Sequence, residues 1–367
     1  MRENTVREVH TRAYRVPTDR PEADGTYAWN ATTLVLVEAE ADSGACGLGF
    51  SYTTKAAADL VHDLLAEVVV GTPATQVGGA WQAMVRQVRN VGLPGVAATA
   101  ISAVDVALWD LRAKLVGQPL YRLLGARREH VPIYGSGGFT SYDERTLRDQ
   151  LGGWVQQGIP RVKMKIGKDR GTCPDEDVAR VRAARDAIGP DARLFVDANG
   201  AYTVAQAIRQ AGRFAEQGVT YFEEPVSSDH LGQLKAVREQ TTLAVAAGEY
   251  GFTPWYFRDM LRADSVDILQ ADATRCLGIT GFLEAAALAH GFGVPFSAHC
   301  APTLHVHVGC AAPAIEHVEY FHDHARIEQL LFDGAPQPTG GFLQPDPERP
   351  GLGLELKDRD AERWQIA

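Results

Sequence analysis

The sequence predicts an α/β protein: a closed (β/α)₈ barrel of the TIM-barrel type, with an α+β capping domain in front of it. Between residues 131 and 321, eight short apolar runs alternate with helical segments, which is the pattern of repeated βα units. The residues before 126 indicate instead a sheet followed by helices. The length of 367 residues also leaves room for a second domain, because a barrel alone needs about 250 residues.

The first third of the chain begins with strand-like segments. Residues 7–14 alternate between polar and apolar side chains, and residues 32–41 are apolar and rich in β-branched residues. The turn residues 42–44 then lead into a further run at 46–53, which completes a hairpin. Helical periodicity follows over residues 55–125. We therefore expect a three-stranded sheet followed by a helical bundle.

These patterns divide the chain into three parts. We expect the capping domain to span residues 1–125 and the barrel domain residues 126–340. The remaining tail, 341–367, is proline-rich at its start and then alternates. We expect it to pack back on the capping domain and complete it.

The predicted barrel strands begin about 22–32 residues apart, which suits βα repeats. Helical segments such as 177–189 and 203–218 lie between them. An open doubly wound sheet is the alternative, but it would usually carry a glycine-rich nucleotide loop after its first strand. The segment GSGGF at 135–139 resembles such a loop only weakly, and we interpret it as a strand-end turn. The predicted strands are 131–138, 161–167, 193–200, 221–225, 243–249, 265–272, 293–299 and 317–321.

Composition and charge exclude several classes of partner. The formal net charge of −10, from 36 basic and 46 acidic residues, argues against a nucleic-acid partner. The five cysteines are scattered without CxxC spacing, which favours reduced thiols in a cytoplasmic protein. The N-terminus shows no signal peptide and no run of about 18 apolar residues is present, so we expect no membrane contact.

Three carboxylates end neighbouring predicted strands. Asp197, Glu223 and Glu249 follow one another at intervals of 26 residues, at the end of the barrel where catalytic groups lie. Adjacent strands are about 4.8 Å apart, so the three carboxylates can converge on one point, where they would repel each other. A hard divalent cation resolves the repulsion, and oxygen-only ligands favour Mg²⁺ or Mn²⁺ over zinc.

Basic groups lie on both sides of these carboxylates. Lys163 and Lys165 stand at i and i+2 on one strand, so both face the barrel interior. Two ammonium groups so close together, near a metal ion, are expected to have depressed pKa values, which suits a lysine that acts as a base. Asp272 and His299 end neighbouring strands, and the carboxylate would fix the imidazole tautomer. Glu319, on the last strand, could donate a hydrogen bond to a substrate carboxylate if it stays protonated.

Together these groups suit abstraction of the proton next to a substrate carboxylate. That step places a second negative charge on the carboxylate as an ene-diolate, which a metal ion and a neutral acid stabilise as it develops. The substrate is then a small-molecule carboxylate. Because the protein as a whole is anionic, the local field must attract this substrate, and a bound divalent cation could supply that field.

The ordered set of motifs resembles the enolase superfamily and, within it, the mandelate racemase subgroup. The resemblance covers the whole chain, and no single motif carries it. It implies that Asp197, Glu223 and Glu249 bind Mg²⁺, that Lys165 is the base on one face, and that His299, assisted by Asp272, acts on the other. It also implies that Lys163 supports Lys165 or the substrate, and that the protein is a homo-oligomer, a dimer or an octamer. The motifs are KMK at 163–165, DAN at 197–199, EEP at 223–225, GE at 248–249, the Asp272/His299 pair and Glu319.

A shared first step leaves the overall reaction open. The ene-diolate can lose a β-hydroxyl, be reprotonated on the opposite face, or form or expel a ring bond. The lysine and histidine–aspartate arrangement resembles acid-sugar dehydratases most often, so we favour a hydro-lyase that forms a 2-keto-3-deoxy acid. A racemase or epimerase of a 2-hydroxy acid, or a cycloisomerase of a cyclic acid or lactone, is the alternative. Either Lys165 or His299 could be the base.

Specificity should come from capping-domain loops at 17–29 and 49–55, which we expect to close over the barrel mouth. The first of these loops is polar, which favours a polyhydroxy acid over mandelate. The candidate substrate-binding residues are Lys163, Asn199, Ser136, Glu319, Tyr27, Trp29 and His322, and His324 is a further candidate.

Other interpretations of single motifs are weaker. His305 and His307 could suggest a zinc site, but a helix is expected there and the spacing would not converge. Cys300 beside His299 could suggest a nucleophile, but neighbouring strand residues point to opposite faces. A catalytically silent barrel would lack a ligand or a base, whereas all are present. An aldolase that forms a Schiff base through Lys165 is a further alternative.

Overall fold

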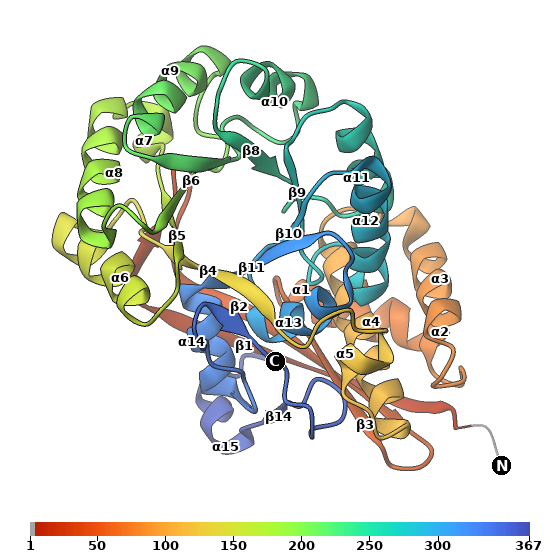
Figure 1. Ribbon diagram of the computed structural model, residues 1–367. Coiled ribbons are helices and arrows are strands. Elements are labelled where there is room, and N and C mark those ends of the chain that lie inside the picture. Colours follow the sequence, from red (N-terminus) through yellow and green to blue (C-terminus); the bar gives the residue numbers. More distant parts are fainter. Residues whose placement is uncertain (1–3) are drawn as a thin grey trace.

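The computed structural model describes residues 4–367 and contains the predicted closed barrel (Figure 1). Parallel strands pair in chain order from β4 to β11, and β11 pairs with β4 to close the ring. Each strand overlaps the run predicted for it. The strands are β4 (Val131–Gly137), β5 (Arg161–Lys165), β6 (Arg193–Asp197), β7 (Val219–Glu223), β8 (Ala244–Ala247), β9 (Ile268–Ala271), β10 (Phe296–Ala298) and β11 (Ile315–Phe321).

Helices surround the ring of strands (Figure 1). The longer helices carry an apolar face toward the strands; in α9, Ala207, Ala211 and Phe214 share one buried face. Thr203 and Gln206 cap the start of this helix with a reciprocal pair of hydrogen bonds. The helices are α6 (Glu144–Gln156), α7 (Lys168–Gly171), α8 (Pro174–Ile188), α9 (Val204–Ala215), α10 (Leu231–Arg238), α11 (Pro254–Arg262), α12 (Gly278–Phe292), α13 (Pro302–Ala311) and α14 (His322–Leu331).

The barrel interior changes from apolar to polar along the strands. Tyr134, Phe195 and Tyr221 belong to a buried layer inside the ring. Because interior side chains recur every second residue, the next interior positions after Phe195 and Tyr221 are Asp197 and Glu223. The aromatic layer therefore lies directly below the polar residues at the carboxyl ends of the strands.

An antiparallel sheet and a helical layer precede the barrel. Helix α4 is buried along most of its length between this sheet and α12, where Asp105 accepts hydrogen bonds from the backbone and hydroxyl of Thr280 at 3.0 and 2.7 Å. The strands are β1 (Val6–Ala23), β2 (Ala28–Ala41) and β3 (Cys46–Tyr52). The helices are α1 (Ala56–Leu60), η1 (Val61–Leu65), α2 (Ala66–Val69), α3 (Val77–Gln87), η2 (Val88–Asn90), α4 (Val96–Leu115) and α5 (Leu120–Leu123).

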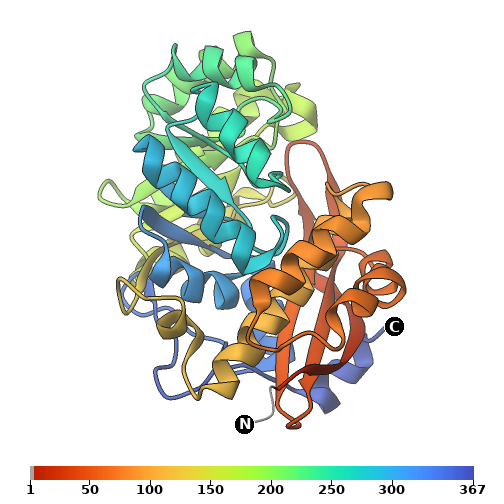
Figure 2. The same ribbon diagram turned by 90° about the vertical axis from the view of Figure 1, so that its right-hand side faces the viewer.

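The segment 17–29 is not the loop that the sequence predicts. Strands β1 and β2 continue through it, and Glu22 pairs with Trp29 and Ala23 with Ala28. Only the residues between the two strands form a turn, in which Asp24 accepts backbone hydrogen bonds from Thr26 and Tyr27. Figure 2 shows the hairpin extending upward beside the barrel. A hydrogen-bonded β-hairpin, and not a loop, therefore holds the predicted capping residues beside the barrel.

The C-terminal tail contacts both parts of the molecule. Strand β13 pairs with β4, while the backbone of Ala13 in β1 exchanges hydrogen bonds with Ile366 and Ala367 at 2.8 and 2.9 Å. In residues 4–367, no helix combines the length and apolar character needed to cross a membrane. The tail elements are β12 (Phe332–Asp333), β13 (Phe342–Leu343), β14 (Glu355–Leu356), α15 (Asp358–Ala361) and η3 (Glu362–Trp364).

A close approach between β3 and α4 predicts a test of the capping-domain packing. A Cβ atom at Gly49 would lie 2.2 Å from the carbonyl oxygen of Ala103, so neither backbone could remain in place. We expect Gly49→Ala to lower the free energy of unfolding by about 1–3 kcal/mol. Gly212→Ala is the matched control, because Gly212 lies in α9 with open space around it. Thermal unfolding followed by circular dichroism measures both, and equal melting temperatures would contradict the expected clash.

Candidate active site

Three buried carboxylates meet at the carboxyl ends of β6, β7 and β8. Asp197 and Glu223 are the last residues of β6 and β7, and Glu249 follows β8 by two residues. One oxygen from each lies within 4.8 Å of the others. The parallel register, which pairs Asp197 with Glu223, brings them to the same level of the barrel.

The donor set of this carboxylate cluster fits a hard divalent cation. The Oε2 atoms of Glu223 and Glu249 are buried and have no hydrogen-bond partner among the described residues. Such atoms cost free energy unless they are compensated. Burial also raises the pKa of Glu223 well above its ordinary value. An oxygen-only, anionic set of this kind is what Mg²⁺ and related cations bind.

Lys163 and Lys165 both face the barrel interior, as predicted. The Nζ atom of Lys163 lies 2.6 Å from Glu223 and 2.8 Å from Glu319, and Lys165 forms an ion pair with Asp197. Burial acts to lower the pKa of each lysine, but the carboxylates outweigh it and raise both values. Without a cation among the carboxylates, their attraction for the ammonium groups exceeds the repulsion between the two lysines. The expected lowering of the pKa, which assumes a nearby metal ion, stays a prediction.

Asp272 and His299 form the predicted pair. The Nδ1 atom of His299 lies 2.8 Å from Asp272 Oδ2, and the other oxygen of Asp272 accepts two hydrogen bonds from Thr274. Burial acts to raise the pKa of Asp272, but the hydrogen bond and the charge of His299 hold it below its ordinary value. An ionised Asp272 keeps the proton on Nδ1 and leaves Nε2 of His299 as the reactive nitrogen.

The surroundings of Glu319 do not favour the protonated form that a hydrogen-bond donor requires. Its Oε1 atom lies 2.8 Å from Lys163 Nζ and accepts a hydrogen bond from Ser136 Oγ at 2.6 Å. Burial acts to raise the pKa of Glu319, yet Lys163 and His299 hold it well below its ordinary value. Lys163 therefore favours the ionised form of Glu319, which argues against the neutral group expected from the sequence.

A cavity of about 330 Å³ opens above these groups. Several predicted residues line it, from the barrel and from the capping hairpin: Lys165, Glu249, His299, Asn199, Tyr27 and Trp29. Ser136, Lys163 and Glu319 are fully buried beneath it and form a hydrogen-bonded support. His322 does not line this cavity, since its ring contacts Asp19 at 3.1 Å beside a separate hollow.

The sequence prediction missed several cavity residues. Arg275 lines the cavity, and its guanidinium lies 3.4 Å from Glu249. Its position three residues after Asp272 is the feature of the sequence that could have identified it as a site residue. Tyr52 stacks on His324 with ring centroids 3.4 Å apart, and both line the cavity. Helix α14 begins at His322, and it turns the candidate His324 toward the cavity and His322 away from it. His305 and His307 lie in α13 and do not converge on a metal site.

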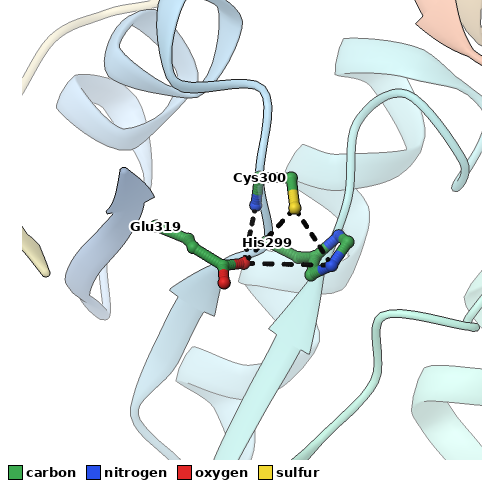
Figure 3. Close-up of side chains that lie close together, drawn as sticks. All are labelled: His299, Cys300 and Glu319. Atoms are coloured by element: carbon green, nitrogen blue, oxygen red, sulfur yellow. Dashed lines mark hydrogen bonds and ion pairs between the residues drawn. The ribbon is translucent and has the colours of Figure 1, made fainter. Parts of the chain in front are cut away.

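Cys300 lies against the reactive nitrogen of His299, contrary to the sequence argument. Its Sγ atom is 3.2 Å from Nε2 of His299 (Figure 3). The argument assumed an extended strand, but β10 ends at Ala298, and Cys300 and Ala301 adopt left-handed φ values of 53° and 37°. The reversed backbone brings Cys300 to the same side as His299. Burial raises the pKa of the Cys300 thiol well above its ordinary value, which disfavours a nucleophilic thiolate.

Comparison with known proteins gives consistent matches over the whole molecule. The chain matches the model of the mandelate racemase / muconate lactonizing enzyme N-terminal domain over residues 6–125 and the enolase C-terminal domain-like model over 146–361. It is 30% identical to an arabinonate dehydratase of Saccharolobus solfataricus, over 90% of each chain. It is 33% identical to a 3,6-anhydro-alpha-L-galactonate cycloisomerase of Streptomyces coelicolor, over 96% of this chain and 97% of the relative.

Solved structures agree with this assignment of the fold. A mandelate racemase/muconate lactonizing enzyme-like protein from Rubrobacter xylanophilus superposes with a TM-score of 0.96 at 51% identity, covering 99% of this chain and 100% of that one. A racemase from Streptomyces coelicolor with bound magnesium superposes with a TM-score of 0.93 at 31% identity, covering 98% and 100%.

A buried carboxyl group in the capping hairpin predicts a pH-dependent stability. Glu22 accepts a hydrogen bond from the indole of Trp29 at 2.8 Å, and burial, with the charge of Asp323 adding to it, raises the pKa of Glu22 from 4.5 to about 9. Folding therefore opposes the ionisation of Glu22. The contribution of this residue to the free energy of unfolding falls as the pH rises from 4.5 to about 9. We expect Glu22→Gln to remove this loss and to be more stable than wild type by on the order of 2 kcal/mol at pH 7. Urea unfolding across the range measures the difference, which should grow with pH; a constant difference would contradict the shift.

Proposed function

Since the chain belongs to the mandelate racemase / muconate lactonizing enzyme family of the enolase superfamily, we propose that it is a magnesium-dependent acid-sugar dehydratase. It would abstract the proton α to a carboxylate and expel the β-hydroxyl, giving a 2-keto-3-deoxy acid. One observation carries the proposal: Lys165 and His299 border the same cavity from non-adjacent strands, next to the carboxylate cluster. Two proton-transfer groups thus face one substrate position beside a cation site.

Asp197, Glu223 and Glu249 are the proposed ligands of Mg²⁺, for which Mn²⁺ is a candidate substitute. When bound, the cation holds the substrate carboxylate and stabilises the negative charge that develops on it. Lys163 stays beneath the cavity, fully buried between Glu223 and Glu319, so its role is to position these two carboxylates.

Lys165 and His299 divide the proton transfers. In the favoured assignment, Lys165 takes the α-proton as a neutral amine, a form that a cation held by Asp197 would favour by offsetting the carboxylate charge that raises the pKa of this lysine. Nε2 of His299 gives a proton to the departing β-hydroxyl, which leaves as water. The carbon–carbon double bond forms as the carbon–oxygen bond breaks, and the resulting enol tautomerises to the keto acid. Asp272 keeps the imidazole oriented and stabilises its protonated form. With the opposite assignment, the two residues exchange these roles.

The cavity lining favours a polyhydroxylated substrate. Polar side chains point into it from the cap and from the barrel, among them those of Asp24, Thr53, Asn199 and Arg275. Tyr27 and Trp29, whose rings stack at an interplanar angle of 12°, add aromatic surface from the hairpin. Hydroxyl groups find hydrogen-bond partners here that a phenyl ring could not use. Arabinonate dehydratase, a relative of this chain, is named for such a substrate.

A substrate screen tests the proposal. We expect purified protein with Mg²⁺ to convert at least one mono- or di-acid sugar to a 2-keto acid, which semicarbazide detects, and a chelator to stop the reaction. Solvent deuterium at the α-carbon without keto-acid formation would replace dehydration by racemisation or epimerisation. Conversion of a lactone or cyclic acid instead would favour cycloisomerisation, the reaction that the Streptomyces coelicolor relative is named for.

Single substitutions test the two proton-transfer residues. We expect Lys165→Ala and His299→Asn each to lower kcat for dehydration by about 10²–10⁴-fold, since each removes one proton transfer. Lys168→Ala and His290→Asn are matched controls, because both side chains lie outside the cavity and should leave kcat unchanged. Turnover of either site variant at the wild-type rate would show that the base or acid is misassigned.

A further inference from the structure

His299, Cys300 and Glu319 form a compact cluster of three different ligand types (Figure 3). The Sγ atom of Cys300 lies 3.2 Å from His299 Nε2 and 3.5 Å from Glu319 Oε2, and the last two atoms are 3.8 Å apart. All three residues are buried, but His299 and Cys300 line the cavity, so a small solute can reach the cluster from there.

These distances match one face of a tetrahedral zinc site. Zinc bonds of about 2.0–2.3 Å to nitrogen, oxygen and sulfur place the ligand atoms of such a face about 3.3–3.6 Å apart. The observed edges of 3.2, 3.5 and 3.8 Å differ from these values by up to about half an ångström, so the three atoms could take up a cation after shifts of that size. The cavity side of the triangle leaves the fourth position to water.

The surrounding contacts orient each ligand atom as metal sites require. Asp272 holds the Nδ1 side of His299, so the lone pair of the neutral imidazole is on Nε2, which also lies 3.4 Å from Glu249 Oε2 in the carboxylate cluster. Ser136 and Lys163 hold Oε1 of Glu319, which leaves Oε2 on the side of Cys300. The next residue helps to hold the left-handed backbone at Cys300, because the N–H of Ala301 donates a hydrogen bond to His324 Nδ1 at 3.3 Å.

The ligand chemistry separates this cluster from the three carboxylates. The cluster of Asp197, Glu223 and Glu249 offers only oxygen, which suits Mg²⁺, whereas thiolate and imidazole favour Zn²⁺ and other softer cations. Binding would displace the proton of the Cys300 thiol to solvent. The resulting thiolate and the Glu319 carboxylate together balance the two charges of the cation.

We propose that His299, Cys300 and Glu319 form a second metal site, for Zn²⁺ or a similar soft divalent cation, and that its occupation inhibits the enzyme. Inhibition follows because the cation takes the lone pair of His299 Nε2, the atom that transfers a proton. This second part rests on the proposed function, whereas metal binding itself does not.

Cobalt binding tests the site independently of activity. Protein in excess Mg²⁺, which fills the carboxylate cluster, is titrated with Co²⁺ while the near-ultraviolet thiolate-to-cobalt charge-transfer absorption is recorded. We expect one equivalent to bind with this absorption in the wild type, and no such absorption in Cys300→Ser. Cys310→Ser is the matched control, because Cys310 is also buried but lies in α13, and it should behave as wild type. Absence of the band in the wild type, or its survival in Cys300→Ser, would overturn the proposal.

Zinc inhibition tests the functional part. We expect the Zn²⁺ concentration that halves turnover to rise at least about tenfold in Cys300→Ser relative to its own uninhibited rate, and not to change in Cys310→Ser. Far-ultraviolet circular dichroism establishes that both variants are folded. A wild type that shows the cobalt band but is not inhibited by Zn²⁺ would leave the metal site in place and overturn the proposed inhibition.

Discussion

The burial of many carboxylates at one end of a closed barrel is the constraint on which the site depends. Burying a charge is costly unless it is paired, and removing one member of a buried pair costs more than the pair contributes. Lys163 is the central compensating group, because it contacts Glu223 and Glu319 and lies 3.7 Å from Asp197. The Oε2 atoms of Glu223 and Glu249, which accept no hydrogen bond from the described residues, are where further positive charge belongs.

The fold supplies this arrangement through the strand period and the barrel register. Aromatic side chains fill the layer below, and the next interior positions of the same strands are charged. The buried aromatic rings of this layer separate the carboxylates from the opposite end of the barrel. The capping hairpin covers the other side with Tyr27 and Trp29, so that the cavity is polar at its base and partly aromatic at its mouth.

Unusual backbone geometry occurs just after several barrel strands. Asn199, Glu224, Cys300 and Ala301 all have positive φ values, and each directly follows or lies just beyond a barrel strand. Such conformations are disfavoured for residues with a Cβ atom and persist only where the surroundings fix them. At Cys300 this conformation changes the chemistry of the site, because it places a thiol against the histidine that the proposed reaction uses.

The sequence by itself determined the barrel, the capping sheet and helices, and the identity of the groups at the strand ends. It could do so because strand and helix periods are local, and because parallel strands of a closed barrel must end at one face. Spacing alone thus brought Asp197, Glu223 and Glu249 together and paired Asp272 with His299. Only the tertiary structure decided the ionisation of Glu319 and the raised pKa values of the lysines, since these depend on distances between charges on different strands. It also decided the side on which Cys300, His322 and His324 lie, because the backbone after a strand is set by what packs around it and not by the period of the strand.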